Sequence, residues 1–208
     1  MKIKVLKEGI HTNHKPTNKN IKFEVNPICS SVTLIRGDKN ILVDTGYYGF
    51  EDEIIDALKK EGLEPNEIDF IINTHCHFDH CANNYLFNKA VKISGTCIWY
   101  DDKRVEVYRK QGLMHVPGVE IIETHGHLIP HISVVVKTDK IYVIAGDSVN
   151  EQIIRKGMYN DINNKEMVIN SIKKIFSIAD VIIPGHGRII KGKNLEELKK
   201  KIDKLQVK

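Results

Sequence analysis

The sequence predicts a layered α/β fold, in which helices cover β-sheets. Short runs rich in isoleucine and valine recur along the chain and are typical of buried strands. A few segments with the apolar spacing of helices lie between these runs. Histidine and aspartate residues directly follow several of the runs. The chain has 208 residues, so we expect one domain over residues 1–208.

The first half of the chain predicts a pair of strands followed by a helix. Residues 31–46 (SVTLIRGDKNILVDTG) contain two apolar runs around a tight Gly-Asp turn. Residues 50–62 (FEDEIIDALKKEG) have acids in the first helical turn and lysines near the end, and Gly62 can serve as the C′ residue. The elements expected next are a strand at 69–73, a short helix at 81–87, a strand at 90–94, and irregular or partly helical structure at 95–118.

The second half predicts four strands and two helices. The strands are expected at 119–123, 132–138, 140–145 and 180–184. Residues 164–179 predict an amphipathic helix with the inward residues Val168, Ile172, Ile175 and Phe176. A last helix is expected from Asn194, with Glu197 placed for a capping interaction. Its apolar face consists of Leu195, Leu198, Ile202 and Leu205.

The composition argues against several classes of protein. A net charge of +4 is too weak to indicate nucleic-acid binding by itself. The start of the chain lacks the apolar region of a signal peptide, and no run approaches the roughly 18 apolar residues of a membrane span. We therefore expect a cytoplasmic protein with reduced thiols and no membrane contact. The cysteines follow no disulfide or Cys-x-x-Cys spacing: Cys29, Cys76, Cys81 and Cys97.

The stretch THCHFDH, residues 74–80, predicts a metal site. His75 and His77 alternate after a predicted strand, so their side chains can point the same way and share one ion. Asp79 and His80 can reach a second ion. Imidazole and carboxylate ligands suit Zn, Fe, Mn or Ni and do not require a thiolate.

Other predicted strands also lead into histidine or aspartate at their carboxyl ends, where layered α/β proteins build their sites. These residues are Asp44, His125, His127, His131, Asp147 and His186. One ion needs three or four protein ligands, whereas this set supplies enough for two ions about 3.5–4 Å apart. The pattern therefore favours a dinuclear site.

Some residues are better explained without a metal. A single histidine after a strand is usually a capping or surface residue, and we assign His11, His14 and His115 to that class. Asp147 alone could be only a helix N-cap. Cys76 alternates with the candidate ligands, so we expect a small packed side chain that points away from them.

From about Ser31 to Gly187, the sequence resembles the metallo-β-lactamase-fold hydrolases. THCHFDH matches the His-x-His-x-Asp-His signature, and THGH, AGD and PGHG follow in the order of that family. VDTG matches its early aspartate motif. The stretch THGHLIPH departs from the usual Thr-Pro-Gly-His-Thr-x-Gly-His, which leaves the role of His131 open.

This resemblance implies a four-layer αββα sandwich with two divalent ions at one edge of the paired sheets. Zn is the expected metal, with Fe or Mn as options. Asp44 would orient the ligands, and Asp147 would bridge the two ions. The first ion would be held by His75, His77 and His127, and the second by Asp79, His80 and His186.

The expected activity is hydrolysis by a metal-bridging hydroxide, which two ions can form near neutral pH. Asp79 would orient this nucleophile and shuttle a proton while it binds metal. The bond cleaved can be an ester, thioester, lactone or phosphodiester. Zinc β-lactamases mostly have Cys at the position of Asp147, so antibiotic hydrolysis is not expected. Two alternatives are a mononuclear iron oxygenase of the same fold and a non-catalytic metal-binding module.

The substrate is expected to be a small molecule or a nucleic acid, and members of this fold often form homodimers. Residues 95–118 are expected to form a wall over the metals. Trp99, Tyr100 and Arg104 are candidates for substrate contact there, and Tyr159 is another. For each of them, ordinary packing or solvation is the favoured interpretation.

Overall fold

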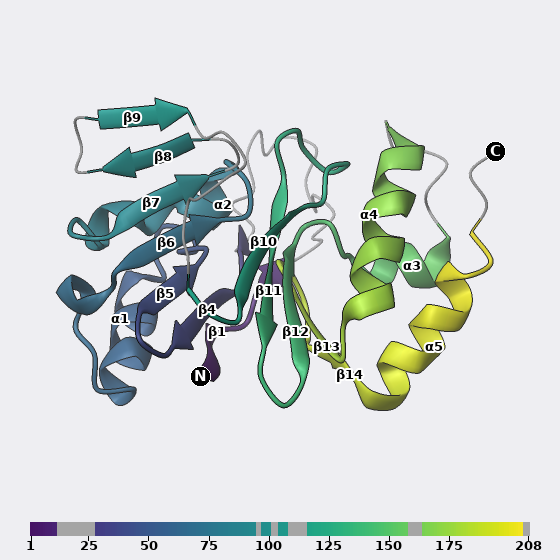
Figure 1. Cartoon of the computed structure of the whole chain (residues 1–208), viewed down its shortest axis with the longest axis horizontal. Coiled ribbons are helices and arrows are strands. Elements are labelled where there is room, and N and C mark those ends of the chain that lie inside the picture. The colour runs from purple at the N-terminus through teal and green to yellow at the C-terminus, as the bar shows by residue number, and fades with distance from the viewer. Residues whose placement is uncertain (12–27, 95–96, 101–103, 108–115, 158–163, 206–208) are drawn as a thin grey trace, which may run out of the picture.

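The computed structural model describes residues 1–11, 28–94, 97–100, 104–107, 116–157 and 164–205. Two β-sheets pack face to face, and helices cover their outer faces (Figure 1). This arrangement is the four-layer αββα sandwich that the family resemblance implied. Within the described residues, no helix is long and apolar enough to cross a membrane.

The first sheet has seven strands in the order β1-β4-β5-β6-β7-β8-β9. Strands β5, β6 and β7 run parallel, and the other neighbours are antiparallel. The strands span Lys2–Lys7 (β1), Val32–Arg36 (β4), Asn40–Val43 (β5), Phe70–Asn73 (β6), Val91–Ser94 (β7), Cys97–Tyr100 (β8) and Arg104–Val107 (β9).

The second sheet has five strands in the order β10-β11-β12-β13-β14, and β12 runs parallel to β13. Its strands span Val119–Glu123 (β10), Ile132–Lys137 (β11), Ile141–Gly146 (β12), Val181–Pro184 (β13) and Ile190–Lys191 (β14). A separate antiparallel pair is formed by Ile10–His11 (β2) and Ile28–Cys29 (β3).

The helices lie on opposite sides of the sandwich (Figure 1). Helix α1 covers the first sheet, whereas α3, α4 and α5 lie beside the second. The helices span Glu51–Lys60 (α1), Phe78–Cys81 (α2), Glu151–Lys156 (α3), Lys165–Ile178 (α4) and Gly192–Ile202 (α5), with 3₁₀ turns at Pro65–Glu67 (η1) and Ala82–Leu86 (η2).

Alternation along the strands explains the layers, because successive side chains point to opposite faces of a sheet. In β5, Leu42 packs under α1, whereas its neighbours Ile41 and Val43 pack between the two sheets. In β12, Ile144 faces the first sheet and Val143 faces the helices α4 and α5. The strand sequences are therefore nearly continuous apolar runs, because both faces of each sheet are covered.

Most predicted elements are confirmed, including the 31–46 strand pair, the helix at 50–62 and the strands on either side of the metal motif. Gly62 follows the C-cap of α1 with a positive φ of 72°, as a C′ glycine does. The residues predicted inward in α4 and the apolar face of α5 all pack into one core cluster.

Three predictions were wrong or inexact. Cys97–Tyr100 and Arg104–Val107 form the strands β8 and β9 rather than irregular or helical structure. The segment 81–87 is mainly a 3₁₀ turn, and one α-helical turn precedes it. The last helix begins at Gly192 with no side-chain cap, and Asn194 accepts a hydrogen bond from Arg155. Glu197 lies 4.0 Å from that same arginine.

The topology brings distant loops to one edge of the sandwich. The parallel strands β5 and β6 end at Val43 and Asn73, next to Asp44 and the THCHFDH motif. The parallel strands β12 and β13 end at Gly146 and Pro184. Backbone hydrogen bonds join the two edges, since Ser31 N donates to Gly185 O at 2.7 Å and Ile132 N donates to Thr74 O at 2.9 Å.

Candidate metal centre

Seven predicted ligands meet at this edge of the sandwich in two groups. In each group, every residue offers one nitrogen or oxygen atom, and these atoms all lie within 4.8 Å of one another. The first group contains His75, His77, His127 and Asp147, and the second contains Asp79, His80 and His186. The division agrees with the one implied by the family resemblance. That these residues hold metal stays a prediction.

In the first group, three imidazole nitrogens converge. His77 Nδ1 lies 2.9 Å from His75 Nε2 and 3.0 Å from His127 Nε2. His75 is buried, whereas His77 and His127 are exposed, so this group faces solvent. The separations suit nitrogens that each bond to one cation at about 2.0–2.1 Å, the Zn–N distance.

The second group lies deeper. His80 is fully buried, and its Nε2 lies 3.6 Å from Asp79 Oδ2. His186 Nε2 lies 3.1 Å from the same oxygen. Asp79 and His186 keep only 13 % and 9 % of their side-chain surface exposed. The second group is therefore less accessible to solvent than the first.

Asp147 connects the two groups through its two carboxylate oxygens. Oδ2 lies 3.5 Å from Nε2 of His127, in the first group. Oδ1 lies 3.4 Å from Nε2 of His80 and 3.5 Å from Nε2 of His186, in the second group. One carboxylate can thus serve two cations, as the resemblance implied for this residue.

Hydrogen bonds on the outer nitrogens orient the buried histidines. Thr74 Oγ1 donates to Asp44 Oδ2 at 2.9 Å, so its lone pair is left to accept from His75 Nδ1 at 3.1 Å. His80 Nδ1 donates to Asp44 Oδ2 at 2.7 Å. These partners leave Nε2 of both histidines as the atom that faces the site, which is how metal-binding histidines are usually held.

His186 is oriented by a part of the chain that the motif search did not single out. Its Nδ1 donates to the carbonyl oxygen of Ile10 at 3.1 Å, so Nε2 again faces the site. Gly9 makes an isolated bridge with Gly187 beside this contact. The N-terminal segment thus helps to orient His186, one of the candidate ligands. Ile10 lies 176 residues from His186 in the sequence, so the local motif around His186 could not predict this contact.

The carboxylates and histidines of the site shift one another's pKa values. Burial alone would raise the pKa of Asp147, but His80, His186 and His127 outweigh it, and the pKa falls well below its usual range. Asp79 is also ionised: burial would raise its pKa, whereas His186 and His80 lower it. Burial would lower the pKa of His80, but Asp44 and Asp147 raise it to about 10. Burial and the neighbouring His80 lower the pKa of His75, which stays neutral.

These residues fit divalent cations. Two buried atoms that point into the site, His80 Nε2 and Asp147 Oδ1, have no hydrogen bond within the described residues. Buried polar atoms are rarely left without a partner, and a cation would satisfy both. Neutral imidazole and ionised carboxylate are ligand types that suit Zn, Fe and Mn.

The structure also gives a place to His131, whose role the sequence left open. This residue is fully buried, and its ring stacks on that of His75 with centroids 5.0 Å apart. Its Nδ1 lies 3.0 Å from both Thr124 Oγ1 and Ser148 Oγ. Burial lowers the pKa of His131 to about 3, so the ring is neutral. It belongs to neither ligand group and packs against the candidate ligand His75.

Other sequence candidates lie outside the two groups. His125 accepts a hydrogen bond from the backbone N–H of His131 and contributes to a pocket rather than to the ligands. Cys76 is exposed, so the expectation that it packs was wrong. His14, His115 and Tyr159 lie outside the described residues, as do the side chains of His11, Trp99, Tyr100 and Arg104.

The fold and the two donor groups define an αββα protein with a candidate metal centre, and the comparisons with known proteins give the family. A family model described as the metallo-beta-lactamase superfamily matches residues 27–105. The chain is 30 % identical over 192 residues to Metallo-beta-lactamase domain-containing protein 1 of Xenopus laevis, with 88 % of this chain and 82 % of the relative covered. The chain belongs to the metallo-β-lactamase superfamily.

Other relatives carry names that refer to hydrolysis. A probable metallo-hydrolase of Methanocaldococcus jannaschii is 35 % identical over 152 residues, which is 72 % of each chain. An N-acyl homoserine lactonase of a Bacillus species is 25 % identical over 146 residues, covering 62 % of this chain and 58 % of its own. The crystal structure of a candidate metallo-beta-lactamase from Thermotoga maritima has a TM-score of 0.66 at 19 % identity, with 91 % and 98 % covered, and shows the shared fold.

Proposed function

We propose that this protein is a hydrolase that uses two divalent ions, most simply Zn²⁺, to cleave an ester, thioester, lactone or phosphodiester bond. The observation that carries the proposal is the position of Asp147, whose two oxygens face two separate donor groups. A single-ion site would need only one of these groups. The relatives named as a metallo-hydrolase and a lactonase support hydrolysis as the reaction type.

Two bound divalent ions would supply a water molecule with a pKa near 7 and a Lewis acid for the substrate oxygen. The chain's own residues then fix the geometry. Asp44 and Ile10 hold His80 and His186 with Nε2 toward the site. The buried second group limits the approach of bulk water, and the exposed first group leaves room for substrate beside His77 and His127.

Asp79 is the residue we propose to handle the proton. Its carboxylate is ionised and lies against His186, so Oδ2 is directed into the second group. From this position the carboxylate can orient the attacking water and pass its proton toward the leaving group. Protein nucleophiles are not needed for this reaction, because water makes the attack.

The test is a comparison of hydrolysis rates on zinc-loaded protein, with an activated phosphodiester, a thioester and a lactone as substrates. Asp79→Asn keeps the side-chain size and removes the charge. We expect the turnover of the preferred substrate to fall by roughly 10²–10⁴-fold, the usual contribution of a positioned acid or base. Asp38→Asn, at an exposed turn away from the site, should match the wild type.

The outcomes of these assays distinguish the hydrolase from the oxygenase and one class of substrate from another. Full activity of Asp79→Asn would sink the role of that residue. No hydrolysis of any substrate, together with one iron per chain and oxygen uptake with a thiol or persulfide, would favour the mononuclear oxygenase. Preference for the phosphodiester would direct the search to nucleotides and nucleic acids, and preference for the thioester or lactone to acyl compounds.

A further inference from the structure

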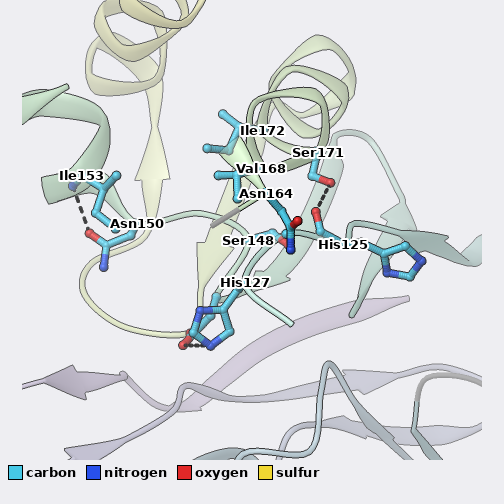
Figure 2. A pocket seen from close by; sticks show the side chains of 11 residues that line it. His125, His127, Ser148, Asn150, Ile153, Asn164, Val168, Ser171 and Ile172 are labelled. Carbon is cyan, nitrogen blue, oxygen red and sulfur yellow. Dashed lines mark hydrogen bonds and ion pairs between the residues drawn. The ribbon is translucent and has the colours of Figure 1, made fainter. Parts of the chain in front are cut away.

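A cavity of about 310 Å³ adjoins the metal centre and shares His127 and Asp147 with it. The rest of its described wall comes from His125 and Gly126 after β10, from the loop before α3, from α3, and from Asn164 and α4. Figure 2 shows Ile153 on one side, Val168 and Ile172 on another, and His127 at the end toward the ligands. A group attached to a bond that is cleaved at the metals can therefore extend directly into this space.

Part of the wall is apolar, and several polar groups beside it already have hydrogen-bond partners within the protein. Ser148 Oγ donates to Thr124 O, and Ser171 Oγ donates to His125 O at 2.6 Å. Asn150 Oδ1 accepts from the backbone N–H groups of Gln152 and Ile153, as the N-cap of α3. These atoms already have partners inside the protein, so an apolar guest would leave none of them unsatisfied.

The described part of the wall offers no positive charge to an anionic guest. Among the described residues that line the cavity there is no lysine or arginine. A phosphate group deep in the cavity would therefore meet no cationic side chain from these residues. When a carbonyl substrate is cleaved, the leaving oxygen or sulfur develops negative charge. The hydrocarbon chain of the acyl group stays uncharged throughout.

We propose that this cavity binds the acyl group of the substrate, and that this group is short, uncharged and aliphatic. The inference rests on the proposed hydrolase function and narrows it to carboxylic esters, thioesters or lactones. The volume supports a short group, because it lies at the lower end of the roughly 300–1,000 Å³ of typical ligand pockets. Ile153, Val168 and Ile172 supply the apolar contacts.

The test uses zinc-loaded full-length protein and p-nitrophenyl esters with acetyl, butyryl, hexanoyl and octanoyl chains. For the wild type we expect kcat/KM to rise at least about tenfold from acetyl to hexanoyl, because each buried methylene favours binding. Ile153→Trp should fill the cavity and bring that ratio close to one. Ile153→Ala should enlarge the cavity and move the optimum toward octanoyl.

Gln152→Trp is the matched control, because it places the same ring on the same helix at an exposed position. A second readout does not depend on turnover: saturation-transfer NMR with hexanamide and acetamide as neutral probes. We expect a hexanamide signal for the wild type and for Gln152→Trp, and its loss in Ile153→Trp. Circular dichroism on each variant checks that the fold is retained.

The two readouts distinguish failure of this inference from failure of the proposed function. If the wild type and both Ile153 variants hydrolyse the esters with the same chain-length ratio of kcat/KM, the acyl site is wrong. The hydrolase function would still be supported by that result. Loss of hexanamide binding in Ile153→Trp, with no hydrolysis by the wild type, would support an apolar site and count against the hydrolase. Absence of hexanamide binding to the wild type would overturn the site.

Discussion

Asp44 Oδ2 lies 2.7 Å from His80 Nδ1, and both side chains are almost completely buried. The same carboxylate accepts from Thr74 N and Thr74 Oγ1. Asp44 adopts a positive φ of 58°, a conformation that aspartate and asparagine tolerate better than most residues. A single residue thus joins the end of β5 to the metal motif and fixes the orientation of one candidate ligand.

Asp44→Asn should weaken metal binding without unfolding the protein. Asparagine keeps the side-chain size and tolerates the backbone conformation, but it loses the charge that holds His80. Changes in such outer partners of a ligand typically cost 10–100-fold in metal affinity, and we expect about that loss. Competition with a chromophoric chelator measures it. An unchanged affinity would show that Asp44 is only structural.

Gly185→Ala should disrupt the second group by direct contact. A Cβ at Gly185 would lie 2.1 Å from Asp147 Oδ1 and 2.9 Å from His80 Cε1, so the carboxylate would have to move. We expect loss of at least one metal ion per chain after dialysis, measured by elemental analysis. Gly37→Ala is the control, since the nearest atom to its new Cβ would be 3.6 Å away. Full metal content in Gly185→Ala would contradict the placement of Asp147.

His131→Phe should lower stability more than it alters the ligands. Phenylalanine has a similar shape, but it cannot form hydrogen bonds with Thr124 Oγ1 or Ser148 Oγ, which are buried with the ring. Loss of a partner for buried polar groups costs about 1–3 kcal/mol, and we expect a decrease of this size in the free energy of unfolding. Urea denaturation measures it. If His131 were instead a ligand, metal content would fall while the stability of the metal-free protein stayed unchanged.

Removal of metal should lower the melting temperature. The candidate ligands converge only in the folded chain, so ions that bind them stabilise it by about 4 kcal/mol per site when free metal exceeds Kd 1,000-fold. For a protein of this length each kcal/mol shifts Tm by about 2–4 °C. We therefore expect calorimetry to show a decrease of about 8 °C or more with a chelator. Asp147→Asn should show a much smaller difference, and equal curves for the wild type would exclude tight binding.

Local patterns in the sequence were sufficient for most elements and for the candidate ligands. The period of apolar residues reflects burial within one strand or helix, so it identifies β4, β5 and α1 without knowledge of their neighbours. It failed for β8 and β9, which form one edge of the first sheet, where charged residues interrupt the apolar run. It also misplaced the start of α5, which lies at Gly192, two residues before Asn194.

The sequence by itself determined which residues can bind metal, since His75, His77, Asp79 and His80 carry that chemistry in a seven-residue stretch. The tertiary structure decided how they are held and what lies beside them. The Ile10 carbonyl on His186 and the cavity between α3 and α4 arise from contacts between segments far apart in the chain. Such contacts depend on how the two sheets pack, and the spacing of residues along the chain does not record them.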